Sequence, residues 1–374
     1  MKSAREPLVW AEVDLDALRH NLRAIRSATH AQVLAVVKAD AYGHGMKAVA
    51  RALAREGVKF FGVANLDEAL ELRRVCPKAK ILVLGSFHPA QVALYARHAI
   101  LPTVSSVEDA VNLSRGLRKR PEPFPVHVKI DTGMGRLGVW HEDAVRFFEA
   151  IRKEKALCVD GLYTHLSSAD RPDPSFTEAQ LALYERAVER ALAAGLRPTY
   201  FHAANSLGLM RFRKSHLNLV RPGIVLYGIN PSAARPPLGL RPVLSLRTRI
   251  SFLKDVEKGR TVSYGATYRA PKKTRIATLA VGYSHGYRVG FSSRAFVSVR
   301  GKRCPVVGRV TMDQTLVDVG RVPAARRWDA VTLIGRDGKS EITARELADL
   351  SGTIPYEIVC SIHTRIPRIY KELR

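Results

Sequence analysis

A lysine stands at the end of an apolar run near the start of the chain. Residues 33–37 read Val-Leu-Ala-Val-Val, and Lys38 follows them directly. Such a run is typical of a strand that is buried on both faces. Burial lowers the pKa of an amine and makes it nucleophilic, which is what Schiff-base chemistry with a carbonyl compound requires. Position alone supports equally well a lysine whose ammonium reaches solvent at the rim of the fold.

Eight apolar, β-branched runs over the first 230 residues are the elements that would position this lysine. They span 32–37, 59–64, 80–84, 99–104, 126–130, 159–164, 198–202 and 223–227. Stretches with helical apolar spacing lie between them, at 46–56, 67–75, 90–98, 107–117, 142–153 and 176–194. Alternating strands and helices in this number predict an α/β fold with a closed (β/α)8 TIM-like barrel. The rival is an open doubly wound sheet, which the lack of a Gly-x-Gly-x-x-Gly turn after the first strand disfavours.

The sequence changes character after residue 230. A proline-rich stretch at 230–241 predicts a linker. Short alternating segments then follow at 244–252, 275–281, 295–299, 305–310, 315–319 and 330–334, with one helix at 343–350. This pattern predicts a C-terminal, mainly-β antiparallel domain. We therefore expect a barrel domain at 12–234 and a β domain formed by 1–11 and 235–374.

The charge of the chain is strongly positive, with 60 Lys and Arg against 34 Asp and Glu and a formal net charge of +26. Such an excess suggests a protein that binds nucleic acid or another anionic surface. Binders of this kind gather basic residues around a reader motif. Here the longest basic clusters, at 118–120, 272–273 and 300–303, are short and separate. We interpret the charge as solvated surface and expect no specific nucleic-acid or membrane partner.

The N-terminus and the cysteines bear on the compartment. The first residues, MKSAREP, lack an apolar core, and no stretch approaches about 18 apolar residues, so we expect a cytoplasmic protein. Cys76, Cys158, Cys304 and Cys360 are scattered without paired spacing. This spacing argues against a disulfide framework and against a zinc ribbon, and we expect no metal site.

The segment around Lys38, VVKADAYGHG at 36–45, resembles the pyridoxal phosphate attachment motif of bacterial alanine racemases. Further blocks resemble the same family in the same order. They are KIDTGMGRLG at 129–138, HLSSAD at 165–170, ANS at 204–206, RPGI at 221–224, SYGATY at 263–268, GRVTMDQ at 308–314 and IPYE at 354–357. Eight blocks in register over nearly the whole chain form a specific signal, whereas one block would be weak.

The resemblance implies a two-base alanine racemase that supplies D-alanine for cell-wall peptidoglycan. Lys38 would carry the cofactor as an aldimine and exchange the α-proton on one face of the substrate. Tyr264 matches the base for the opposite face, which the family takes from the partner subunit of a homodimer. A phenol with a pKa near 10 needs a polarising neighbour to act near pH 7. His165 and Arg221 match the family's hydrogen-bonded chain to that tyrosine.

Arg221 also matches the residue that faces the pyridine nitrogen of the cofactor. Arginine has no acceptor and stays protonated, so it would keep that nitrogen unprotonated. Most pyridoxal enzymes place a carboxylate there, which makes the ring a deeper electron sink. The resemblance thus implies a short-lived carbanion and little transamination.

Other matches concern the phosphate end of the cofactor. Tyr42, Ser206, Gly223, Ile224 and Tyr356 match the residues that bind the phosphate, with Gly223 and Ile224 expected to begin the eighth strand. A phosphate site after the seventh and eighth strands is usual for this fold.

The substrate side has its own set of matches. Arg136 matches the residue beside the phenolic oxygen and the substrate carboxylate, and Lys129 matches a lysine that is carbamylated in some members. Met312 and Asp313 match substrate-binding residues that cross the dimer interface, and Tyr283 matches the inner gate of a channel that favours a small side chain.

Three departures from the family pattern concern the outer channel. Thr311 stands where the family often has Cys, His285 stands where it often has Asp, and the Arg-rich stretch is altered at 288–291. A racemase of broader substrate range therefore stays open as an alternative. A decarboxylase of basic amino acids needs no second base, so the Tyr264 motif argues against it.

Overall fold

The computed structural model describes residues 6–231 and 238–372, and the chain divides into two compact units. One comprises Met1–Ala17, Tyr42–Gly45 and Arg241–Arg374, and the other comprises Leu18–Ala41 and Met46–Leu240, in each case for the residues that the structure describes. We call them the β unit and the barrel unit. Half of the expected linker at 230–241, namely residues 232–237, lies outside the described residues.

Eight parallel strands form the closed ring of the barrel unit. They are β2 (Gln32–Val36), β3 (Phe60–Val63), β4 (Lys80–Val83), β5 (Thr103–Val104), β6 (Phe124–Asp131), β8 (Leu157–Tyr163), β9 (Tyr200–His202) and β10 (Leu219–Val220). Two ladders, β10-β2-β3-β4 and β5-β6-β8-β9, make up most of the ring. A parallel bridge between Leu82 and Leu101 joins them on one side, and the Arg221 amide donates to the Ala204 carbonyl at 2.9 Å on the other. The predicted barrel is confirmed.

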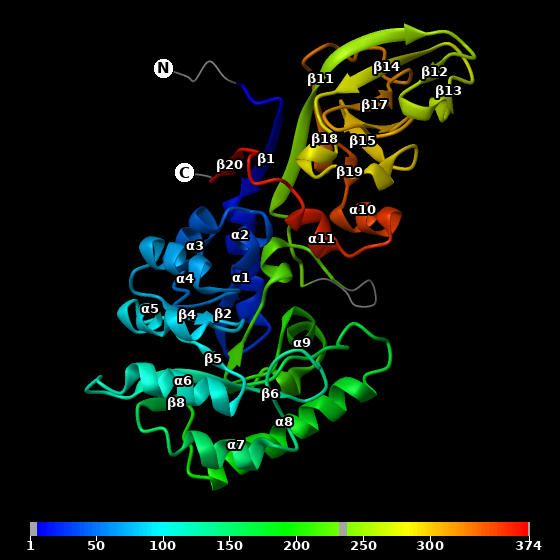
Figure 1. Ribbon diagram of the computed structural model, residues 1–374. Coiled ribbons are helices and arrows are strands. Elements are labelled where there is room, and N and C mark those ends of the chain that lie inside the picture. The colour runs from blue at the N-terminus through cyan, green and yellow to red at the C-terminus, as the bar shows by residue number, and fades with distance from the viewer. Residues whose placement is uncertain (1–5, 232–237, 373–374) are drawn as a thin grey trace. The chain divides into compact units, whose positions relative to one another are not determined.

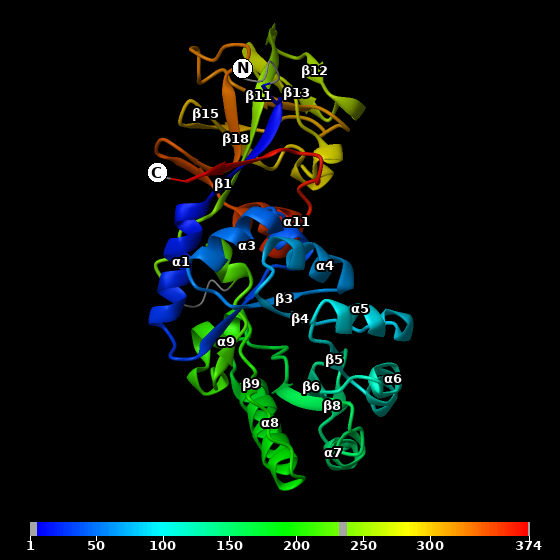
Figure 2. The same ribbon diagram turned by 90° about the vertical axis from the view of Figure 1, so that its left-hand side faces the viewer.

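Helices lie outside these strands (Figures 1 and 2). They are α3 (Met46–Arg55), α4 (Leu66–Val75), α5 (Val92–Arg97), α6 (Val107–Leu117), α7 (Ala144–Ile151), α8 (Ser175–Ala193) and α9 (Ser206–Arg211), with α1 (Leu15–Ser27) preceding β2. Helix α3 buries Met46, Val49, Ala50 and Leu53, the spacing of one helical face. Side-chain caps start α4 and α6, where Asn65 and Ser106 each accept a backbone N–H three residues on.

The eighth strand differs from its prediction. The strand is Leu219–Val220, and the predicted segment 223–227 is instead a buried 3-10 turn at Ile224–Tyr227. Pro222 donates no backbone hydrogen bond, and Gly223 has φ −118° and ψ −95°, outside the strand region. Periodicity cannot separate a short buried turn from a buried strand. Arg221 and Gly223 therefore both follow the carboxyl end of β10.

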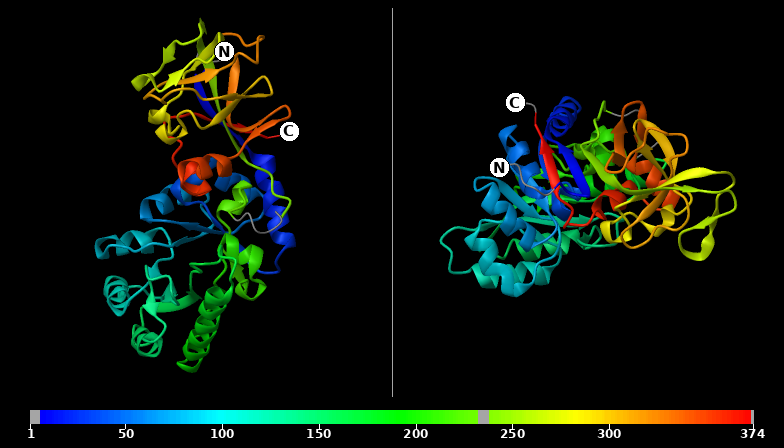
Figure 3. Two further views of the ribbon diagram at one scale, coloured as in Figure 1. Left: turned by 90° about the vertical axis from the view of Figure 1, so that its right-hand side faces the viewer. Right: turned by 90° about the horizontal axis from the view of Figure 1, so that it is seen from above.

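The β unit is built around one long strand. Strand β11 (Leu244–Val256) pairs with β1 (Val9–Asp14), β14 (Thr274–Leu279) and β18 (Ala330–Asp337), all antiparallel, and Figure 2 labels β1, β11 and β18 together. Further strands complete the sheet, namely β15 (Phe296–Val299), β16 (Lys302–Pro305), β17 (Thr315–Asp318), β19 (Ser340–Ile342) and β20 (Arg368–Lys371), which runs parallel to β1. Figure 3 shows the part of this unit after residue 241 in yellow-green to red and β1 in blue. The predicted mainly-β domain is confirmed.

Two expectations for the β unit were wrong. Residues 305–310 are not a strand, because β16 ends at Pro305 and Gly308 takes a positive φ of 71°. A second helix, α11 (Pro355–Cys360), follows α10 (Ala344–Ser351). Six residues are too short to display helical periodicity, although the proline in the first turn is a known start signal.

A short segment from the barrel sequence belongs to the β unit. A Cβ on Gly43 would lie 2.3 Å from the Val359 carbonyl oxygen, and one on Gly45 would lie 1.9 Å from the Tyr370 hydroxyl. Both glycines also have positive φ angles, 79° and 91°. Only glycine fits this close approach, which accounts for the spacing Gly43-His44-Gly45.

Within 6–231 and 238–372, no helix has the length and apolar character that a membrane span needs.

Candidate active site

Lys38 follows β2 after one residue, Val37, and opens a left-handed turn. Ala39, Asp40, Ala41 and Tyr42 have φ angles of 53°, 51°, 56° and 54°. This region is sparsely populated by residues other than glycine, and four in succession are rare. Backbone strain of this kind gathers at functional sites when the surroundings hold it.

Arg221 is the centre of a buried polar network in the barrel unit. Its side chain is 3% exposed. One terminal nitrogen, Nη2, donates to the carbonyls of Thr164 at 2.7 Å and Ala203 at 3.1 Å, and lies 3.3 Å from His165 Nδ1. The other, Nη1, lies 2.9 Å from His202 Nδ1. Burial lowers the pKa of Arg221 to about 10, so the guanidinium stays charged near neutral pH.

The histidines of this network have defined tautomers. Because a guanidinium only donates, Nδ1 of His165 and of His202 must accept, which places their protons on Nε2. His202 Nε2 then donates to His127 Nδ1 at 2.9 Å. Burial, together with nearby cations, lowers the pKa of His127 to about 3 and holds the pKa values of His165 and His202 well below the usual range. All three rings are neutral, and the Nε2–H of His165 is available to donate.

Lys129 and Arg136 lie at the end of β6 and in the loop that follows. Burial, and then the charge of Arg136, lowers the pKa of Lys129 to about 8, and the Lys129 side chain is 3% exposed. Asp131 orders the loop by accepting from the amides of Gly133, Met134 and Arg136 at 2.9, 2.8 and 3.1 Å. Burial raises the pKa of Asp131, but these amides outweigh it and hold the pKa below its usual value.

The donor set of the barrel unit fits an anionic cofactor. Lys38, Lys129, Arg136 and Arg221 all act on the pKa of His165, and their charges lower it. At Lys129 the negative charge of Asp131 acts against these cations and raises the lysine pKa. The Asp131 carboxylate, however, already accepts hydrogen bonds from backbone amides. A concentration of cations around buried side chains is costly unless an anion compensates it. A phosphate-bearing group that takes a carboxylate substrate has the required charge.

Ser206 and Gly223 meet where the phosphate of such a group is expected. Ser206 follows β9, Gly223 follows β10, and the Gly223 amide donates to Ser206 Oγ at 3.0 Å. The Ile224 amide is next along the same turn. The ends of the seventh and eighth strands are the usual phosphate site of this barrel.

The other expected residues lie in the β unit. The rings of Tyr42 and Tyr356 are 6.1 Å apart. Tyr283 and Ser284 donate through their amides to the Thr311 and Met312 carbonyls, each at 3.0 Å. Ser284 Oγ donates to Asp313 at 2.9 Å, so Tyr283, Met312 and Asp313 lie on two loops that are tied together.

Tyr264 lies in a different turn of the β unit. It sits in the turn between β12 (Thr261–Val262) and β13 (Tyr268–Arg269), and its side chain is 71% exposed. The turn is held by Ser263, whose hydroxyl donates to the Arg309 carbonyl at 2.6 Å. Each unit therefore contributes its own part of the expected set.

Several residues of the network were missed from sequence. His127 and His202 stand inside apolar strands, and Tyr163 stacks on His202 with ring centroids 4.6 Å apart. A polar residue at an inward position of a barrel strand was the available signal. Asp131 could have been found from its place at the end of β6, before a Thr-Gly turn.

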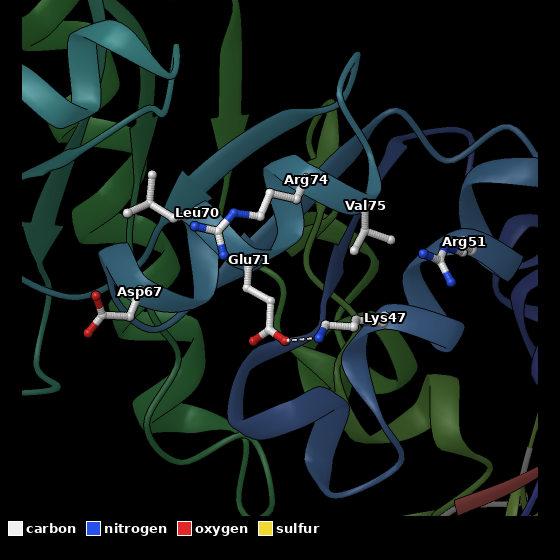
Figure 4. A pocket seen from close by; sticks show the side chains of 7 residues that line it. All are labelled: Lys47, Arg51, Asp67, Leu70, Glu71, Arg74 and Val75. Atoms are coloured by element: carbon white, nitrogen blue, oxygen red, sulfur yellow. Dashed lines mark ion pairs between the residues drawn. The ribbon is translucent and has the colours of Figure 1, made fainter.

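A separate groove of about 520 Å³ lies between α3 and α4 (Figure 4). Its lining includes Lys47, Arg51, Asp67, Glu71 and Arg74, and the Lys47 ammonium lies 3.0 Å from the Glu71 carboxylate. These side chains are solvent-exposed or half-buried, and no residue of the family blocks lies among them. The groove has charge but none of the burial that characterises the Arg221 network.

No group of three or more His, Cys, Asp or Glu among the described residues could hold a metal ion.

Comparison with known proteins agrees with this geometry. Residues 13–231 match the family model of the alanine racemase N-terminal domain, and residues 243–370 match that of the alanine racemase C-terminal domain. The alanine racemase of Carboxydothermus hydrogenoformans is 43% identical over 365 residues, which cover 97% of this chain and 99% of that protein.

Two solved structures are also similar. The alanine racemase of Bacillus anthracis with bound L-Ala-P is 36% identical, with a TM-score of 0.92 over 99% of this chain and 96% of that chain. The alanine racemase of Bartonella henselae with covalently bound pyridoxal phosphate is 28% identical, with a TM-score of 0.89 over 98% of this chain and all of that chain. This chain belongs to the alanine racemase family.

Proposed function

We propose that this isomerase interconverts L-alanine and D-alanine, with pyridoxal 5'-phosphate as cofactor and with two bases, one on each face of the substrate. The observation that carries the proposal is the buried Arg221 network, in which one guanidinium meets His165 beside the buried Lys129. D-Alanine made in this way would supply cell-wall peptidoglycan.

The cofactor would be held by the residues that match the family's cofactor set. Lys38 would hold it through its amine, and the phosphate would lie among Ser206, Gly223 and Ile224. Tyr42 and Tyr356, whose rings are 6.1 Å apart, match the family's phosphate-binding tyrosines. Pyridoxal phosphate, when bound, withdraws electrons from a substrate amine and makes its α-proton acidic. The covalently bound pyridoxal phosphate of the Bartonella henselae structure supports this choice of cofactor.

Arg221 would set the protonation of the pyridine nitrogen. The guanidinium has no acceptor, and with a pKa of about 10 it stays charged near neutral pH, so it can only donate to that nitrogen. Its hydrogen bonds to the Thr164 and Ala203 carbonyls hold it in place. An unprotonated ring favours prompt return of the proton to the α-carbon over transamination.

Lys38 Nζ would move the α-proton on one face and Tyr264 Oη on the other. A tyrosine hydroxyl needs help to act near pH 7, because its usual pKa is near 10. His165 is suited to help, since its neutral ring keeps Nδ1 toward Arg221 and presents Nε2–H as a donor. We propose that this donor polarises Tyr264 Oη.

Arg136, Met312 and Asp313 would receive the substrate carboxylate, and Tyr283 would limit the side chain to a small one. Lys129, with its lowered pKa, would orient Arg136 and is chemically suited to carbamylation because a neutral amine reacts with carbon dioxide. The loops of Tyr283 and Asp313 are joined through Ser284, which supports a common role for them.

We propose a homodimer in which Tyr264 of the partner subunit completes each site. The exposed side chains of Tyr264, Tyr283 and Met312, at 71%, 44% and 54%, are large apolar groups in the β unit, as expected of residues that a partner covers. We also propose a cytoplasmic location, which the scattered positions of the cysteines, without paired spacing, support because disulfide frameworks are rare in reducing compartments.

The test is incubation of the purified enzyme and cofactor with L-alanine, followed by chiral separation of the product. We expect D-alanine to approach an equal mixture and pyruvate to stay a trace. Lys38→Ala should abolish both D-alanine formation and the visible absorbance of the lysine-bound cofactor. Retention of that absorbance in the variant would remove Lys38 from its role.

Substrate breadth needs a parallel assay. Rates on lysine, arginine and serine should lie far below the rate on alanine. Comparable rates would favour the broader racemase, and a product without an amino-acid carboxylate would favour a decarboxylase.

A further inference from the structure

The left-handed turn after Lys38 is held by a carboxylate from the neighbouring strand–helix unit. Glu68, on α4, accepts from the Ala39 amide through Oε1 at 2.7 Å and from the Ala64 amide through Oε2 at 2.8 Å. Ala39 follows β2 and Ala64 follows β3, and these strands are parallel neighbours. One carboxylate therefore ties the carboxyl ends of two barrel strands together.

The bond to Ala39 controls the backbone of Lys38. The Ala39 amide belongs to the peptide plane that follows the Lys38 Cα, so fixing this plane fixes the ψ angle of Lys38. It also holds the first of the left-handed residues, Ala39 with φ 53° and ψ 53°. L-Residues are unfavourable in this region, because Cβ crowds the following carbonyl oxygen. Hydrogen bonds to a charged carboxylate are stronger than neutral ones and suit this task.

The chain contains a natural comparison for this arrangement. On α6, Asp109 accepts from the Ser105 amide at 2.8 Å, just as Glu68 accepts from the Ala64 amide, in each case four residues earlier. This bond is therefore an ordinary link between a barrel strand and its helix. What distinguishes Glu68 is its second bond, to Ala39, which spans 29 residues of sequence.

We propose that Glu68 is a positioning residue for Lys38, which it aims by holding the left-handed turn through the Ala39 amide. The inference rests on the proposed role of Lys38 as lysine base and cofactor anchor. Glu68 itself would touch no reacting atom. The extra methylene of glutamate, compared with aspartate, is what lets one oxygen reach across to the next strand.

Glu68→Asp in the holoenzyme is the main test. The shorter carboxylate keeps the bond to Ala64, as Asp109 does at its own strand, but no longer reaches Ala39. A misplaced Lys38 should lower kcat for alanine by about 10- to 100-fold with little change in KM. The α-deuterium isotope effect should rise in the one reaction direction in which Lys38 removes the proton, and the visible absorbance should titrate at a different pH.

Three further variants separate positioning from folding. Asp109→Asn neutralises the matched carboxylate away from Lys38, while its amide oxygen can still accept from Ser105, and it should leave kcat and the absorbance unchanged. Glu68→Gln keeps the chain length but turns a donor toward one amide, so it should reproduce the loss. Ala39→Gly adopts the left-handed conformation without strain and should restore part of the activity of Glu68→Asp.

The outcomes distinguish this inference from the proposed function. If the parent enzyme makes no D-alanine or lacks the lysine-bound absorbance, the proposed function fails first. If the parent is active but Glu68→Asp and Glu68→Gln keep kcat within twofold, or if Asp109→Asn loses as much as they do, Glu68 has only a structural role. If Glu68→Asp does not fold, an unchanged isotope effect and absorbance in Glu68→Gln would likewise overturn the inference.

Discussion

Two regions of the barrel unit use the same residue types in opposite settings. In the α3–α4 groove, Lys47 and Glu71 form an ion pair whose side chains are 61% and 45% exposed, so water screens the attraction. In the Arg221 network, arginine and lysine side chains are 3% exposed, and burial lowers their pKa values to about 10 and about 8. Burial, not the number of charges, is therefore what sets Arg221 and Lys129 apart from the other cations of this basic chain.

Removing the central buried cation should give the largest effect. Arg221→Met leaves the acceptors of Thr164, Ala203 and His202 buried without a donor, which costs stability, and it would remove the proposed electrostatic contact to the cofactor. We expect kcat/KM to fall on the order of 10³-fold. Steady-state kinetics and urea unfolding measure the two effects. Arg213→Met, at an exposed site, should change neither, and a loss below tenfold at Arg221 would contradict its central role.

Tyr264 tests whether a side chain that is exposed in the single chain can still be needed for catalysis. Its side chain is 71% exposed, yet the proposed dimer makes it a base. Tyr264→Phe should lower kcat by about 10²-fold, as loss of a general base does, while the cofactor stays bound. Tyr268→Phe, in the same hairpin, is the control. If Tyr264→Phe turns over alanine at nearly the parent rate, the exposed Tyr264 side chain has no catalytic role and is excluded as the second base.

The lowered pKa of Lys129 predicts a pH-dependent stability that the exposed groove should not show. A lysine with a folded pKa of about 8 and an ordinary unfolded value of 10.5 binds fewer protons in the folded state between these values. Below pH 8 the buried charge of Lys129 therefore lowers the free energy of unfolding by its full amount. This free energy should rise by up to about 3 kcal/mol as the pH rises to 10.5. Urea unfolding of the cofactor-free chain, without bicarbonate, measures this gain.

Lys129→Met is the reference for that measurement, because it removes the titrating amine and keeps the apolar stem. The difference in unfolding free energy between the parent and this variant should shrink from pH 8 to pH 10.5. A difference that stays constant over this range would mean that Lys129 titrates normally.

The smallest effect is expected in the groove. Lys47→Ala, Glu71→Ala and the double variant form a thermodynamic cycle for the 3.0 Å ion pair. Its coupling should be below about 1 kcal/mol and should disappear in high salt, and racemisation should be unaffected. A coupling of several kcal/mol would erase the contrast between the two regions.

Much of the fold could be predicted from the sequence because it follows from local patterns. Apolar runs separated by helical spacing indicated the parallel barrel, and short alternating segments indicated the β domain. The error at 223–227 arose because a buried 3-10 turn and a buried strand share the same apolar composition. Helix α11 was missed because six residues show no period.

In the candidate site, only the residues inside the family motifs could be predicted from the sequence. The spacing around Lys38, His165 and Arg221 identified the family, which the comparisons then confirmed. The residues that hold these groups escaped, because hydrogen bonds over 19 to 75 positions, such as Arg221–His202 and His127–His202, leave no local mark. Glu68 escaped for the same reason.

The sequence by itself determined most of the order of strands and helices, the family, and the candidates for the reactive side chains, since each of these depends on residues close together in the chain. Only the tertiary structure decided which cations are buried, which histidine nitrogens carry protons and what holds the strained turn after Lys38. These properties depend on desolvation and on hydrogen bonds between distant segments, and a chain acquires both only when it closes its barrel.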